Sequence, residues 1–156
     1  MPLLAGSILT AADLLAGFPK GQLANNVASG ASAAMSAVGA VVTLPSTSAT
    51  ITNNDSVTRN YIAYASVRVN MASGANGIYR PLVTNGATSA LGGGTEQFHS
   101  PIAGSTGQTG ASTFYAFTLA ASASLTLGSG GLRVSGGGAT DTFVGGRLTV
   151  LDLGAA

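Results

Sequence analysis

Apolar and polar residues alternate most clearly between Tyr61 and Met71. The odd-numbered positions carry alanine or larger apolar side chains, and the even-numbered positions include Tyr64, Ser66, Arg68 and Asn70. Side chains of a strand point to its two faces in turn, whereas a helix would scatter the polar set around its circumference. The pattern therefore predicts a strand over 61–71 with one buried face.

Shorter runs of the same kind recur along the chain, separated by turns rich in glycine, serine and asparagine. Pro81 cannot donate a backbone hydrogen bond, so its strand is expected to be an edge or bulged strand. No helical pattern lies between the runs, which favours an all-β antiparallel sandwich or barrel. The further strands are predicted at Ala40–Leu44, Ala49–Thr52, Ile78–Thr84, Glu96–Ile102, Thr113–Ala120, two within Ser124–Gly138 joined at Gly128–Gly131, and Arg147–Leu153.

The first part of the chain differs from the rest. Thr10 is a helix N-cap candidate, with Asp13 three residues later in the place of a capping-box glutamate, and Gly17 and Pro19 would end the helix. So short a helix is not stable alone and must dock, on its own domain or on a neighbouring subunit. We predict an arm over 1–21, a linker of small residues over 22–39 and a β-domain over 40–156. The predicted anchoring residues are Ile8, Leu9, Leu14, Leu15 and Phe18.

The last predicted strand, Arg147–Leu153, has no cleanly polar face. Leu148 and Val150 share one face with Asp152, and three apolar or hydroxyl residues share the other with Arg147. This indicates an inner strand, covered by a second sheet on one side and by a neighbouring copy on the other. Arg147 and Asp152 are predicted to make polar contacts between subunits, with a solvated face as the alternative. The many inward alanines indicate closely spaced sheets or a threefold axis.

Composition narrows the class of partner. Charged residues make up 7% of the chain and the net charge is +1, which argues against nucleic acid because phosphates require clustered cations. So few charges protect a surface poorly against association, so we expect it to be covered by partners or by copies of the chain. The strand patterns argue against low-complexity disorder. The most membrane-like stretch, 31–44, is too short for a span and stops at Pro45, so no membrane association is expected.

The chain offers little chemistry. It has one histidine, His99, and no cysteine, which excludes the common zinc sets, and its carboxylates are isolated in sequence. The residue types of a Ser-His-Asp set are present, but no motif links them, and the G-x-S-x-G pattern is absent. The glycine runs match no phosphate-binding loop. We therefore expect no catalytic residue, no cofactor and no metal, and we expect His99 to be a loop or inter-subunit polar residue.

Three stretches resemble a known family. The glycine-bounded end Gly145–Gly154, the preceding Thr113–Leu127 and the N-terminal Gly6–Gly17 resemble small structural proteins of tailed bacteriophages, especially those infecting actinobacteria. These are usually minor tail or capsid decoration proteins, and related sandwiches often form trimers. The resemblance implies a jelly-roll-like sandwich behind a short N-terminal arm, with no catalytic residues.

Together these observations predict a non-catalytic virion protein. The expected role is capsid decoration as a homotrimer on the particle surface, with the chain itself and the major capsid protein or other virion proteins as partners. A minor tail or tail-tip protein is the alternative within this class. A carbohydrate- or cell-surface-binding module is the alternative from another class, and an enzyme is disfavoured because the inventory of reactive groups is so thin.

Overall fold

The computed structural model describes residues 18–35, 37–71, 75–93, 97–99 and 108–156, and within these ranges the chain forms antiparallel strands and no helix. The strands are β1 (Gly21–Ala34), β2 (Val41–Thr43), β3 (Ala49–Thr52), β4 (Arg59–Asn70), β5 (Gly77–Thr84), β6 (Ala90–Gly93), β7 (Gln97–His99), β8 (Gln108–Leu119), β9 (Ser124–Gly136) and β10 (Thr142–Ala155).

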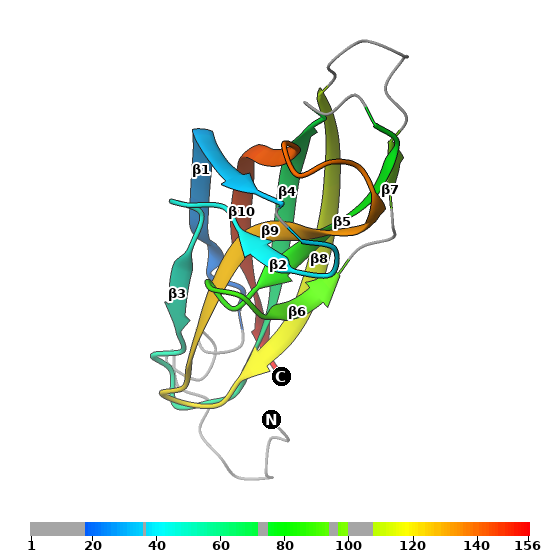
Figure 1. The fold of residues 1–156 in the computed structure, drawn as a ribbon. Helices are drawn as coiled ribbons and strands as arrows, with labels where there is room; N and C mark the ends of the chain where they lie inside the picture. The colour runs from blue at the N-terminus through cyan, green and yellow to red at the C-terminus, as the bar shows by residue number, and fades with distance from the viewer. Residues whose placement is uncertain (1–17, 36, 72–74, 94–96, 100–107) are drawn as a thin grey trace, which may run out of the picture.

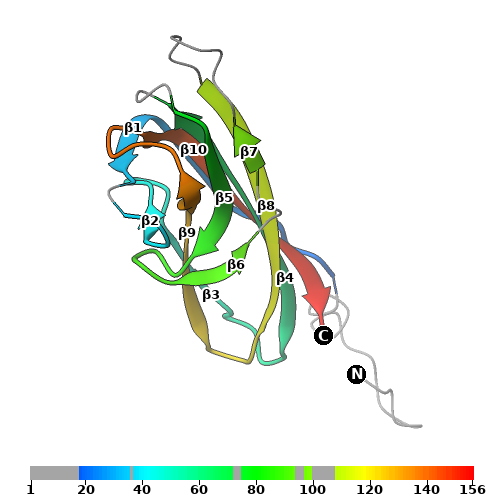
Figure 2. The ribbon, with the colours of Figure 1, turned by 45° about the vertical axis from the view of Figure 1, so that its right-hand side comes forward.

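The strands form two sheets that pack face to face as a sandwich (Figures 1 and 2). Sheet A has the order β1-β10-β4-β8, and sheet B has the order β2-β9-β5-β6 with β3 also on β9 and β7 also on β5. Each sheet therefore pairs strands from the start of the chain with strands from its end. The all-β antiparallel sandwich predicted from the hydrophobic pattern is confirmed.

Sheet B has interrupted strands along both of its sides. β2 and β3 pair with successive parts of β9, and β7 and β6 pair with successive parts of β5. β6 takes Leu82–Thr84 and β7 takes Gly77–Tyr79, so Pro81 faces the interval between them. Of the two alternatives that Pro81 suggested, β5 is not an edge strand but a bulged one, with register shifts at Ile78/Tyr79 against β9 and at Val83/Thr84 against β6. Neither β6 nor β7 pairs with Pro81, so the proline breaks no ladder on that side of β5.

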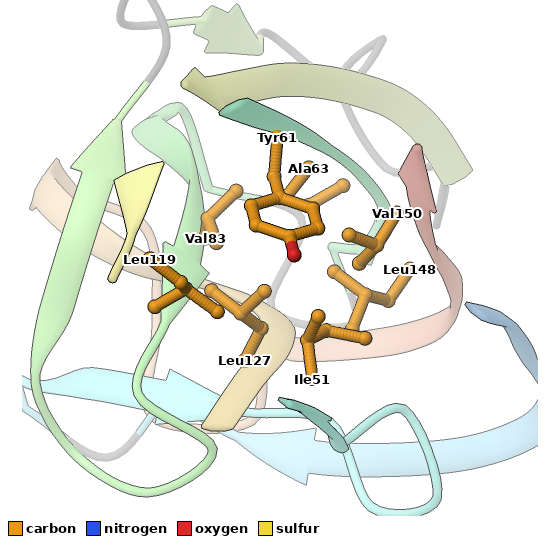
Figure 3. Close-up of a cluster of buried hydrophobic side chains, with 9 residues drawn as sticks. Ile51, Tyr61, Ala63, Val83, Leu119, Leu127, Leu148 and Val150 are labelled. Carbon is orange, nitrogen blue, oxygen red and sulfur yellow. The ribbon is translucent and has the colours of Figure 1, made fainter. Parts of the chain in front are cut away.

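The core lies between the sheets in two clusters of buried side chains. The first gathers residues from both sheets around Tyr61, and its labelled members are drawn in Figure 3: Ile51, Tyr61, Ala63, Val83, Leu119, Leu127, Leu148 and Val150. The second contains Met35, Leu44, Val67, Val69, Met71, Tyr79 and Phe143. The predicted buried face of 61–71 is confirmed, because every odd-numbered side chain from Tyr61 to Met71 is buried. The alanines of β4 face the opposite sheet.

The predicted linker over 22–39 is wrong, because Gly21–Ala34 is a strand that pairs with β10. Its residues alternate in burial, with Ala24, Asn26 and Ala28 turned toward the core. Alternation among alanine, serine and asparagine leaves almost no hydrophobic signal, which is why the sequence concealed it. β6 was missed for the same reason, because no strand was predicted between Thr84 and Glu96.

The glycine turn expected at Gly128–Gly131 is also absent, because β9 runs unbroken through it. Close packing against neighbouring residues leaves no room for a Cβ at Gly130 and Gly131. A Cβ on Gly130 would lie 2.0 Å from the Val42 carbonyl oxygen, and one on Gly131 would lie 2.5 Å from the ring of Phe143. The glycines let β2 and the core approach β9 closely.

The last strand occupies the inner position predicted for it. β10 lies between β1 and β4 in sheet A, with Leu148, Val150 and Asp152 buried beneath sheet B. Its other face carries Leu151 and Leu153, both exposed in the single chain. Covering of that face by a neighbouring copy stays a prediction.

Candidate functional site

Arg59 is the centre of a buried polar network at one end of sheet A. Its Nε donates to Asp152 Oδ2 over 2.8 Å and its Nη2 to Asp152 Oδ1 over 2.9 Å, which is the two-pronged arrangement that arginine and carboxylate favour. Both side chains are 1% exposed. Asp152 Oδ1 also accepts the N–H of Gly154, and Arg59 also donates to the carbonyl oxygen of Phe18. The network therefore fixes the point where the N-terminal segment joins the sandwich.

Asp55 extends this network toward solvent. It accepts from Arg59 Nη1 over 2.7 Å and from Lys20 Nζ over 2.6 Å. The hydrogen bond from Lys20 and the two positive charges lower the pKa of Asp55 below its ordinary value, against a smaller opposing effect of desolvation. Lys20 immediately precedes β1, so this ion pair ties the start of β1 to the turn before β4.

The lowered pKa of Asp55 predicts an acid-sensitive contribution to stability. A carboxyl group with a lower pKa in the folded state stabilises the fold above its unfolded pKa of about 4, and this contribution is lost as the pH falls through the folded pKa. The melting temperature of Asp55→Asn should therefore fall less than that of the wild type as the pH is lowered from about 5 to about 2. Thermal unfolding followed by circular dichroism measures it, with Thr58→Asn as the control. Identical pH profiles for Asp55→Asn and the wild type would contradict the assignment.

A second buried polar cluster lies at the other end of the core. Asp141, fully buried, accepts from the Tyr79 hydroxyl and from the N–H of Gly138, both over 2.7 Å. Burial and the nearby Asp141 carboxylate raise the pKa of Tyr79, so the phenol stays protonated as a donor. Arg133 is buried opposite Tyr79 in the β5–β9 ladder. The cluster closes the loop after β9.

The two polar residues of the last strand that were predicted to contact another subunit lie in different environments. Asp152 was predicted to contact another subunit, and this is wrong, because Arg59 of the same chain binds both of its oxygens in the core. Arg147 is exposed on the opposite face of β10, where a contact with a neighbour stays a prediction. His99 belongs to strand β7, opposite Gly77, rather than to a loop.

Most of the predicted anchoring arm precedes the first described residue, Phe18. Ile8, Leu9, Leu14 and Leu15, and the helix expected around them, lie outside the described residues. Phe18 is described, and its side chain is exposed. Within the described part of the chain, no three histidine, aspartate or glutamate side chains gather as metal ligands. The same residues contain no helix long and apolar enough to cross a membrane.

The most prominent surface feature is the face of sheet A that points away from sheet B, which we call the outer face. Tyr64 on β4 and Phe114 on β8 are directly opposite in the antiparallel register, and they are 45% and 68% exposed. Exposed aliphatic side chains continue the face across β10 and β1, namely Leu151, Leu153, Leu23 and Val27. Large apolar side chains gathered on one face indicate a contact surface rather than ordinary scatter.

A shallow hollow in the outer face lies where β10 carries a bulge. It is lined by Arg68, Arg147 and Tyr64 and by the two glycines of the bulge, Gly145 and Gly146. Gly145 has a φ of 58°, and a Cβ on Gly146 would lie 2.5 Å from the Ser66 carbonyl oxygen, so both positions require glycine. Among the described residues, no carboxylate lines this hollow. It is therefore a cationic, partly apolar depression.

The buried ion pair was not predicted, although the sequence contains a pattern that indicates it. Arg59 is in phase with the buried odd-numbered positions of β4, and Asp152 is in phase with Leu148 and Val150. When two strands each carry a charge of opposite sign at a position that points into the core, the two residues are expected to form a buried ion pair. The outer face had no such signal, because it depends on which strands are neighbours. Comparison with protein-family models and with curated protein sequences finds no match to this chain.

Proposed function

We propose that this chain is a non-catalytic structural protein of a bacteriophage virion. Its role would be capsid decoration, as a homotrimer on the particle surface in contact with the major capsid protein or other virion proteins. The observation that carries this proposal is the outer face, where exposed aromatic and aliphatic side chains gather on one side of sheet A in a protein with only 7% charged residues. Such a surface suits permanent contact within an assembly.

The ionisable side chains support a structural role. Asp152, Asp55 and Arg59 hold the start of β1 to the end of β10, and Asp141 holds the loop after β9. A catalytic carboxylate or histidine needs access to substrate and a group that exchanges protons with it. These carboxylates are instead engaged in contacts that stabilise the fold.

The strand order supports a jelly roll, which the resemblance implied. When β2 with β3, and β6 with β7, are each counted as one interrupted strand, the two sheets contain equal numbers of strands. In sheet A, strands from the first half of the chain, β1 and β4, alternate with strands from the second half, β10 and β8. A double-sheet arrangement of this kind is typical of viral capsid domains, although fold alone does not establish function.

The proposal predicts that the outer face is required for particle binding. Tyr64→Glu with Phe114→Glu should reduce recovery of the purified protein with particles that lack this protein by at least about tenfold, because charge would be buried against the shell. Co-sedimentation measures this, and Thr50→Glu with Thr126→Glu on the exposed face of sheet B is the matched control. Undiminished binding of the outer-face variant, with both variants folded, would contradict the proposal.

Copy number separates the two virion locations. Quantitative mass spectrometry of particles, against the major capsid protein, should find hundreds of copies per particle for a decoration protein. A handful of copies would place the protein at the tail or tail tip. Absence from purified particles would refute both locations.

A carbohydrate-binding module is the second candidate, favoured by the exposed pair of Tyr64 and Phe114. Aromatic rings exposed side by side can stack on sugar rings, with Arg147 nearby to contact polar or acidic groups. A glycan array distinguishes this candidate. Specific hits that disappear with Phe114→Ala would favour it over particle binding, and an array without specific hits would exclude the glycans it displays.

A further inference from the structure

The two sheets differ in how their edges are protected. An edge strand exposes unpaired backbone groups that another chain can pair with, and proteins usually prevent this with short strands, charges or proline. Sheet B follows this rule, since its edges consist of β2, β3, β6 and β7, none longer than 4 residues. Pro45 stands between β2 and β3. These edges are poor templates for pairing.

Sheet A has long edges without such protection. β1 contains 14 residues and β8 contains 12, and neither strand contains a lysine, arginine, aspartate, glutamate or proline. Among the described residues, β1 pairs only with β10, and β8 pairs only with β4. The charges of sheet A lie on its two inner strands, at Arg59, Arg68, Arg147 and Asp152. Of the usual forms of edge protection, β1 has only the irregularities at its two register shifts.

The strand directions decide how two copies can meet. Each neighbouring pair in the order β1-β10-β4-β8 is antiparallel, so β1 and β8 run in opposite directions at opposite sides of the sheet (Figure 1). A second copy rotated about an axis along the strands therefore places its β1 antiparallel to β8 of the first. This arrangement uses both edges of every copy, whereas pairing β1 with β1 would leave each β8 exposed.

We infer that copies of this chain associate edge to edge, with β1 of one copy added to sheet A of the next alongside β8. The occupant of each edge is a second copy, because both edges are uncharged and self-association brings no like charges together on these strands. A head-to-tail contact of this type generates a closed ring when the rotation closes and an open filament when it does not. This inference deepens the proposed trimer by naming its contact, and it uses the edges rather than the outer face.

Cysteine crosslinking tests this contact directly, because the chain has no cysteine of its own. Val27 on β1 faces outward, as do four residues along β8. Within one chain the two strands are separated by three strand spacings, about 14 Å. A disulfide requires Cα atoms within about 7 Å, so any bond must join two copies. The full-length double variants combine Val27→Cys with Ser112→Cys, Phe114→Cys, Ala116→Cys or Thr118→Cys.

We expect at least one of these double variants to form interchain disulfides on mild oxidation, seen as dimers and higher species on a non-reducing gel. Thr50→Cys with Ser112→Cys, which joins the edge of sheet B to β8, is the matched control and should stay uncrosslinked. Failure of all four pairs would overturn the inference. Equal crosslinking of Val27→Cys alone would indicate β1–β1 pairing and would overturn it too.

Lysine substitutions provide a second readout that does not depend on a chosen register. Asn25→Lys with Ser29→Lys places charge on the β1 edge and should raise the dissociation constant for self-association at least about tenfold. Thr50→Lys with Thr52→Lys on β3 should leave it unchanged. Light scattering coupled to gel filtration measures the mass, and circular dichroism verifies folding. A wild-type chain that is monomeric at high concentration overturns the inference, whereas loss of particle binding by correctly crosslinked oligomers would refute the proposed function alone.

Discussion

Arg59→Met should lower the free energy of unfolding by about 3–5 kcal/mol, because it leaves the Asp152 carboxylate in the core without its positive partner. The loss is large because burial removes the water that would otherwise solvate the charge. The same substitution removes the hydrogen bond that Arg59 donates to the Phe18 carbonyl. Urea unfolding at neutral pH measures the change.

The double variant Arg59→Met with Asp152→Leu identifies the cause. Removing both charges avoids an unpaired carboxylate, so this variant should be more stable than Arg59→Met alone. Arg147→Met, an exposed arginine on β10, is the control and should change stability by less than about 0.5 kcal/mol. If the double variant were as unstable as the sum of the two single ones, the two charges would not be coupled as the structure indicates.

Phe143→Ala should cost about 3–5 kcal/mol, because it removes a fully buried ring from the second core cluster. The ring of Phe143 fills the space above Gly131, where a Cβ would lie 2.5 Å from it. Gly131→Ala should therefore destabilise by about 1–3 kcal/mol through overpacking. The measurement is again the unfolding midpoint and slope in urea.

These two positions should also be coupled. Combining Phe143→Leu with Gly131→Ala gives the new methyl group part of the space that the ring vacates, so the double variant should lose less than the sum of the single losses. Phe114→Ala removes the same kind of side chain from the exposed outer face and is the matched control. A loss for Phe114→Ala as large as that for Phe143→Ala would contradict the assignment of the core.

How much the sequence predicts depends on the size of the alternating side chains. β4 was predicted because tyrosine and valine mark its inward positions, and β3 was predicted with its observed bounds. β1 was missed because its inward positions carry small side chains, which lose little by exposure. In β9, glycines that serve close packing look the same in sequence as glycines that serve a turn.

The partners of polar residues were harder to predict than their faces. Asp152 was correctly placed on the face shared by Leu148 and Val150, yet its partner comes from a strand far away in the chain. Periodicity gives the direction of a side chain along one strand, whereas a contact between strands depends on their order and register. The outer face was unpredictable for the same reason, since Tyr64 and Phe114 become neighbours only when β4 pairs with β8.

The pairing of β1 with β10 has a consequence for the order of folding. Gly21, at the start of the described sandwich, pairs with Asp152 near its end, and β4 depends on β10 as its inner neighbour. During synthesis, therefore, sheet A cannot assemble until the ribosome has released residues close to Ala155. Long-range pairing of this kind is typical of domains that fold in milliseconds to seconds rather than microseconds. A nascent chain that stalls before β10 should stay protease-sensitive throughout sheet A.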